Sequence, residues 1–105
     1  MLATLIIPCP DRTSLHTSYR SNLVEHFGGF TAREATGGWS DGRQTITEPV
    51  TVYDVAMEGN AADMEHMRCL ARQVGQEMEQ DCVYLAFNPA VNIEFIVPEP
   101  LEKAA

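Results

Sequence analysis

The feature that most constrains the fold is an apolar stripe with helical spacing in the second half of the chain. Asn60 and Asp63 precede it and form a start signal that resembles a capping box. The pattern predicts an amphipathic helix from about residue 60 to about residue 80, whose apolar side must pack on another layer. The stripe consists of Met64, Met67, Leu70, Ala71, Val74 and Met78.

The segments on either side of this helix predict strands and one further helix. Residues 2–7 form a short apolar run that ends at two prolines, which is typical of a buried strand. Apolar residues at every fourth position predict a first helix over residues 14–27, which Gly28 ends. Alternating segments before and after the Asp41-Gly42 pair predict a long hairpin that runs to residue 57.

The element order predicts the fold class. Strand, helix, two strands, helix and strand is the order of the ferredoxin-like split βαβ fold, an α+β fold with two helices on one face of an antiparallel-rich sheet. After a turn at residues 88–90, alternating apolar residues predict an extra C-terminal hairpin strand that ends at Val97. We expect one domain over residues 1–97 and a flexible tail over residues 98–105.

The strand over residues 50–57 carries apolar residues on both of its faces. One layer of helices covers only one face of a sheet, so the other face requires a second cover. We expect that cover to be another copy of the chain, which makes the protein a homo-oligomer.

The charge of the chain excludes two classes of partner. The formal net charge is −8, and an acidic surface repels both the phosphate backbone of nucleic acids and anionic membranes. In residues 1–43 four arginines balance four acids, whereas residues 44–105 carry three basic and eleven acidic residues. We therefore expect no direct binding to nucleic acid or membrane, and a local cluster of cations outside the acidic half.

The chain lacks a run of about 18 apolar residues that could span a membrane, and its first residues lack the basic start of a signal peptide. Both observations predict a cytoplasmic protein. Cys9, Cys69 and Cys82 are odd in number and have no CxxC spacing, so we expect reduced thiols that act as small core residues.

Three histidines and one cysteine suggest a metal site, because imidazole and thiolate are the usual zinc ligands. Cys69 lies about 160° from the centre of the apolar stripe, however, and so faces away from the predicted sheet. The spacing indicates no complete ligand set, and we expect neither a metal nor another cofactor. The residues concerned are His16, His26, His66 and Cys69.

The best candidates for ligand binding flank the turn of the predicted hairpin. Trp39 offers a large aromatic face and Arg43 a guanidinium, a pairing that stacks on planar ligands or anchors a partner protein. Arg33 and Arg12 are the cations expected to complete an anion-binding site, since arginine suits bidentate contacts to phosphate and carboxylate. The alternative is that Trp39 folds back over the core as a hydrophobic lid.

Asp54 is a candidate catalytic acid or base, because it is a carboxylate on an otherwise apolar strand. We favour a second interpretation, in which Asp54 pairs with an arginine or lies at a strand edge. No nucleophile elbow, Walker loop, zinc-protease motif or dinucleotide fingerprint occurs in the sequence. We therefore expect no enzymatic activity.

Several short motifs over residues 25–96 resemble an uncharacterised family of small bacterial and phage proteins. They are Phe27-Gly28-Gly29-Phe30-Thr31, Gly38-Trp39 with Asp41-Gly42, Glu48-Pro49, and Gln76-Glu77 through Val83-Tyr84 with a closing apolar strand. The members form a domain of unknown function, and many carry a secretion signal that this chain lacks. The resemblance implies a ferredoxin-like fold and, by analogy, a cytoplasmic and phage-encoded protein.

These observations leave three functions to compare. The leading one is a non-catalytic binding module that binds a host protein or sequesters a small anionic, nucleotide-like ligand as a counter-defence factor. The second is an acidic decoy that inhibits a nucleic-acid-binding host enzyme, and the third is a small dimeric enzyme with a pocket between subunits. The decoy would use Glu48, Asp54, Glu58, Asp63, Glu65, Glu77, Glu79 and Asp81.

Overall fold

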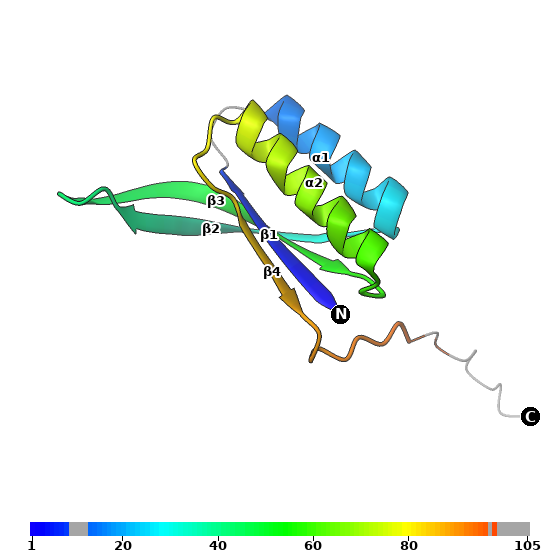
Figure 1. The fold of residues 1–105 in the computed structure, drawn as a ribbon. Helices are drawn as coiled ribbons and strands as arrows, with labels where there is room; N and C mark the ends of the chain where they lie inside the picture. Colours follow the sequence, from blue (N-terminus) through cyan, green and yellow to red (C-terminus); the bar gives the residue numbers. More distant parts are fainter. Residues whose placement is uncertain (9–12, 97, 99–105) are drawn as a thin grey trace, which may run out of the picture.

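The computed structural model describes residues 1–8, 13–96 and 98. Four strands and two helices follow one another in the order that the sequence predicts (Figure 1). They are β1 (Leu2–Pro8), α1 (Thr13–Phe27), β2 (Thr31–Ser40), β3 (Thr45–Ala56), α2 (Ala61–Glu77) and β4 (Tyr84–Asn88).

The strands form one antiparallel sheet in the order β2-β3-β1-β4. β1 and β3 are the central strands, and β2 and β4 are the edges. Each helix connects two strands that are not neighbours in the sheet, which is the split βαβ arrangement. The prediction of an α+β, ferredoxin-like fold with both helices on one face is confirmed (Figure 1).

The core lies between the helices and one face of the sheet. Ala3, Leu5 and Ile7 of β1 point toward the helices, and Tyr53 and Val55 of β3 lie beside them. The first helix contributes Tyr19 and Leu23, and the second contributes Met67, Leu70, Val74 and the following Met78.

The second helix begins and ends where the sequence predicts. The side chain of Asn60 accepts a hydrogen bond from the backbone N–H of Asp63 at 2.8 Å, which satisfies one of the free donors at the start of α2. Met67, Leu70 and Val74 are buried and Cys69 is exposed, so the apolar stripe faces the sheet. At the end of α1, Gly28 adopts φ +88 and its N–H binds the carbonyl of Val24, as expected of a left-handed cap.

The other face of the sheet, which we call the open face, bears no helix or strand of the described part of the chain (Figure 1). Successive side chains of a strand alternate between faces, so the register assigns its members. They are Leu2, Thr4, Ile6 and Pro8 of β1, Val50, Val52, Asp54 and Ala56 of β3, Tyr84, Ala86 and Asn88 of β4, and Thr31, Arg33 and Ala35 of β2.

The hairpin of β2 and β3 continues beyond the rest of the sheet. β1 ends at Pro8, opposite Val50, whereas β2 and β3 stay paired to Ser40 and Thr45. We call residues 37–48 the arm, and it projects from the body of the molecule (Figure 1). Pro49 lies at the base of the arm, just beyond the last residue that pairs with β1, and there β3 pairs only with β2 among the described residues. The missing N–H of Pro49 therefore leaves no gap between β1 and β3.

Two sequence-based expectations need correction. The extra C-terminal strand does not form in residues 91–96, and Val97 lies outside the described residues. Alternation indicates which side chains share a face, but a strand also needs a neighbour, and the turn after Asn88 directs the chain away from β4. Cys69 and Cys82 are exposed free thiols and not core residues.

None of the helices in the described ranges is long and apolar enough to cross a lipid bilayer. Of the proposed tail, residues 98–105, the structure describes only Pro98. Cys9 also lies outside the described residues.

Candidate functional site

The tip of the arm is an ordered turn. Asp41 Oδ1 accepts the backbone N–H groups of Arg43 at 2.8 Å and Gln44 at 2.9 Å, and Ser40 Oγ accepts that of Gly42 at 3.1 Å. The hydrogen bonds from Gln44 and then Arg43 hold the pKa of Asp41 below its ordinary value of 3.8. Gly42 adopts φ +92, which favours glycine, and the turn therefore holds its neighbours in a defined geometry.

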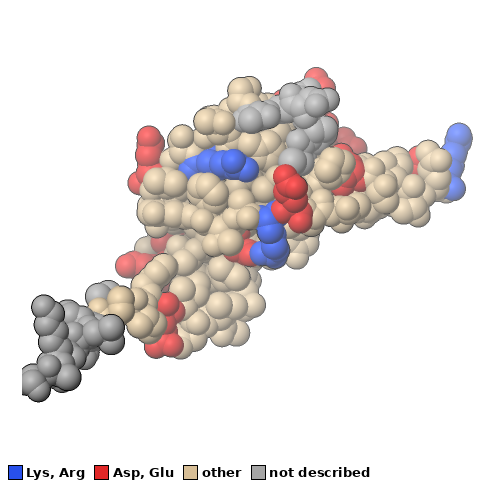
Figure 2. Space-filling view, turned by 180° about the vertical axis from the view of Figure 1, so that it is seen from behind, with Lys and Arg blue, Asp and Glu red and all other residues tan. Residues whose placement is uncertain are grey.

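Trp39 and Arg43 are displayed on this arm. Trp39 lies opposite Ile46 and is 44% exposed, so it does not fold back over the core. Arg43 is exposed in the turn and makes no ion pair with a residue that the structure describes. In the space-filling view the far end of the arm is basic (Figure 2).

The other two predicted arginines do not join this site. Arg33 lies six residues before Trp39 on the same face of β2, roughly 20 Å away at about 3.3 Å per residue. It forms an ion pair with Asp54, whose other oxygen accepts a hydrogen bond from Thr4 at 2.7 Å. The expectation that Asp54 pairs with an arginine is confirmed, and Arg12 lies outside the described residues.

A surface hollow lies away from the arm, beside the start of α2. It has a volume of about 510 Å³ and is lined by His26, Asp63 and Glu58 together with apolar residues such as Phe27 and Phe95. His26 Nε2 lies 3.5 Å from Asp63 Oδ1. Its described lining holds one imidazole and two carboxylates, which are groups capable of acid–base and of nucleophilic chemistry.

A second imidazole lies behind this hollow. The ring of His66 stacks on that of His26, with centroids 3.6 Å apart, and Phe27 packs edge-on against both rings. His66 Nε2 forms a 2.8 Å hydrogen bond with Asn22 Oδ1. These contacts join the end of α1 to the first half of α2.

His16 takes part in a buried polar network between α1 and the sheet. Its Nε2 donates to the carbonyl oxygen of Pro8 at 2.7 Å, and its Nδ1 accepts from the Tyr53 hydroxyl at 2.7 Å. Arg20 Nε donates to the same hydroxyl at 3.0 Å. Because Tyr53 is fully buried and His16 almost so, the network stabilises the packing of α1 on β3 and does not face a ligand.

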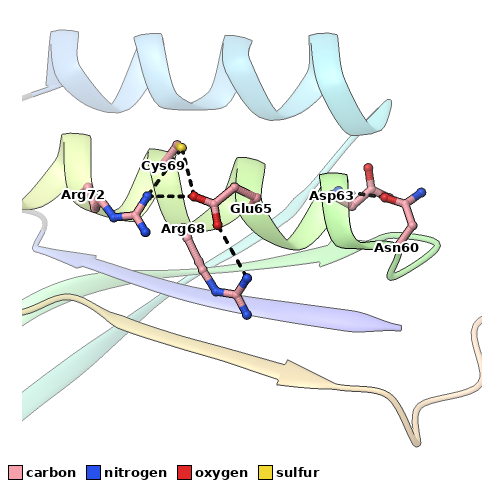
Figure 3. A network of polar contacts seen from close by, with 6 residues as sticks. All are labelled: Asn60, Asp63, Glu65, Arg68, Cys69 and Arg72. Atoms are coloured by element: carbon pink, nitrogen blue, oxygen red, sulfur yellow. Dashed lines mark hydrogen bonds and ion pairs between the residues drawn. The ribbon is translucent and has the colours of Figure 1, made fainter.

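The exposed side of α2 carries a third polar network (Figure 3). Glu65 binds Arg72 at 3.0 Å and lies 3.6 Å from Arg68, and Cys69 Sγ lies between Glu65 and Arg72. Arg72 holds the pKa of Glu65 below its ordinary value of 4.5. His66 points instead toward α1, so the His66 and Cys69 pair does not converge. Within the described ranges no group of three or more His, Cys, Asp or Glu residues could hold a metal ion.

The acids of the proposed decoy surface are dispersed and partly paired. Asp54 contacts Arg33 on the open face, Glu48 lies on the arm, and Glu65 contacts two arginines on α2. Asp63 lies beside His26 in the hollow, and Glu77 accepts a hydrogen bond from Tyr19. These five carboxylates therefore lie on different parts of the fold, and four of them contact a polar side chain.

Sequence reasoning missed the histidine stack and the His16 network. His26 and His66 are 40 positions apart, and no spacing rule joins two residues on different helices. His26 lies near the end of the first helix and His66 near the start of the second. These positions indicate a contact only once the two helices are known to be antiparallel neighbours (Figure 1).

No known protein-family model matches the chain, and no curated protein is detectably similar to it in sequence.

Proposed function

We propose that this protein is a non-catalytic binding module that recognises a partner protein with its arm. The observation that carries the proposal is the exposure of Trp39 and Arg43 on a two-stranded projection held by an ordered turn. Tryptophan and arginine are the residue types that most often dominate protein interfaces. A partner with an apolar pocket beside a carboxylate suits this pair, and a phage-encoded chain would find it on a host protein.

The arrangement favours a protein over a small anion. A site for a nucleotide-like ligand needs several converging cations in a concave pocket. Arg33 is neutralised by Asp54 and is distant from the tip, so Arg43 is the one predicted cation beside Trp39 among the residues that the structure describes. The hollows of 360 to 510 Å³ are lined by other residues.

Site-specific photocrosslinking in a bacterial host tests the proposal. A photoreactive amino acid at Gln44, beside the tip, should yield one discrete crosslinked protein, whereas the same group at Ser21, exposed on α1, should not. Once the partner is identified and purified, Trp39→Ala in this protein should raise the Kd of the complex by about 30-fold or more, the loss typical of an anchor residue. Val24→Ala, which removes an exposed apolar side chain elsewhere, should leave binding unchanged.

Two results would count against recognition of a partner protein by the arm. One is the same set of crosslinks from positions 44 and 21. The other is a rise in Tm with inorganic phosphate or a nucleotide that Arg43→Ala abolishes, which would favour sequestration of a small anion.

A further inference from the structure

The open face of the sheet is apolar at its centre. One row across the four strands consists of Arg33, Val52, Ile6 and Tyr84, each directly opposite the next. Val50 and Val52 are only 6% exposed although neither belongs to the core cluster on the helix side, so their neighbours within one copy already cover most of these two side chains. Tyr84 is 59% exposed, so a large aromatic side chain stays uncovered at the edge-strand end of this row.

The charges of this face cancel within the face itself. Arg33 and Asp54 form an ion pair, and Thr4 satisfies the second oxygen of that carboxylate. Glu48 lies beyond, on the arm. The chain as a whole carries a formal charge of −8, so the open face is a neutral surface on an acidic molecule.

We infer that the open face is the interface of a homodimer, in which two copies pack sheet against sheet about a two-fold axis. A basic partner protein would need unpaired carboxylates on this face. The carboxylate at its centre, Asp54, is already paired with Arg33, so the face does not suit a basic partner. A second copy supplies a neutral and apolar surface of the same size, and two sheets pack well at about 10 Å. It also covers Tyr84, the large side chain of this face that one copy leaves exposed.

The size of the face sets the expected affinity. Four strands about 4.8 Å apart and about seven residues long at 3.3 Å per residue span roughly 400 Å² in projection. The accessible area of the face is larger than this projection, because side chains roughen it. The area buried on both copies together should therefore lie near the small end of specific interfaces, at about 1,200 Å² or less. We therefore expect a dimer with a Kd of about 1–100 µM.

The dimer does not depend on what the arm binds. Because the arm continues past the end of β1, it extends beyond the paired sheets, and each dimer presents two tips. Linked binding sites gain avidity over single ones. The purified protein alone is sufficient for the test, so its outcome is separable from that of the crosslinking experiment.

Sedimentation equilibrium from about 1 µM to about 500 µM protein measures the association. The wild-type protein should dimerise, and Tyr84→Arg should raise the Kd at least tenfold. Val24→Arg is the matched control, because it places the same charge at an exposed apolar position on α1 and should change the Kd less than about twofold. Adding a positive charge to an acidic protein lowers repulsion, so weakening by Tyr84→Arg cannot arise from net charge.

Salt gives an independent readout. Two acidic copies repel each other, and about 500 mM NaCl screens that repulsion, so the Kd should stay constant or fall relative to about 50 mM. The inference is overturned by a monomeric wild-type protein at the highest concentration, by equal effects of the two arginine variants, or by dissociation in high salt. Circular dichroism of each variant confirms that it is folded.

Discussion

The imidazole rings of His26 and His66 lie almost parallel, 3.6 Å apart with 8° between their planes. Burial, and to a lesser extent repulsion from His26, lower the pKa of His66 below its ordinary value of 6.5, while Asp63 acts in the opposite direction. The stack therefore disfavours protonation of His66, and it makes the contact between α1 and α2 sensitive to pH.

The first prediction follows from this pKa. As the pH falls, the unfolded chain takes up a proton on His66 near pH 6.5, before the folded protein does. The unfolded state then binds more protons, so the free energy of unfolding decreases below about pH 6.5. We expect Tm to fall between about pH 7.5 and pH 5.5, and to fall less in His66→Gln, whose amide still donates to Asn22.

An NMR titration separates this effect from other groups. The pKa of His66 should lie below 6.5 in the wild-type protein and should rise in His26→Gln, which removes the neighbouring charge. Parallel Tm profiles for the wild-type protein and His66→Gln would show that the stack does not control the pH dependence.

The second prediction concerns the buried network of His16. Tyr53→Phe removes the hydroxyl that donates to His16 Nδ1 and accepts from Arg20. An unsatisfied buried acceptor costs about 1–3 kcal/mol, so urea denaturation should show a loss of that size. Ser21→Ala removes a hydroxyl from an exposed position on α1 and should change stability by less than about 0.5 kcal/mol. A similar loss in both variants would refute the role of the network.

The third prediction compares two adjacent glycines. Gly28 has φ +88 and ends α1, whereas Gly29 lies outside the left-handed region, and neither has an atom within 4 Å of an added Cβ. Gly28→Ala should therefore lower the free energy of unfolding by about 1–2 kcal/mol through backbone strain alone. Gly29→Ala should be neutral or slightly stabilising, because it restricts the unfolded chain. Chemical denaturation of the two variants measures the difference.

The fourth prediction tests the order of the arm. Asp41→Ala removes the acceptor for the N–H groups of Arg43 and Gln44, so hydrogen exchange at these two amides should accelerate severalfold while α2 stays protected. Asp81→Ala removes the same charge from another exposed loop and serves as the control. Unchanged exchange in Asp41→Ala would mean that the side chain does not hold the turn.

Local signals predicted most of the fold. The stripe from Met64 to Met78, the cap at Asn60 and the turn at Asp41-Gly42 each depend on residues within a few positions of one another, and each is confirmed. The pairing of Asp54 with an arginine was also foreseeable, because a lone carboxylate on an apolar strand needs a partner.

Long-range geometry set the rest. The open face emerges only from the register of four strands, and the His26 and His66 stack only from the placement of two helices. Alternation predicted a strand from residue 91 onward, and in the described residues 91–96 no strand forms, because alternation carries no information about a neighbouring strand. Arg33 does not join Trp39 and Arg43, because residues that are near in sequence lie far apart along an extended strand.

The termination of β1 at Pro8, opposite Val50, divides the hairpin into two parts with different tolerance to mutation. Changes toward the body disturb three strands and the core, whereas changes at the tip disturb only one pair of strands. Related chains can thus diverge at the tip without losing their architecture. For the same reason, exchanging the turn for that of another chain is a direct route to redirecting what the molecule recognises.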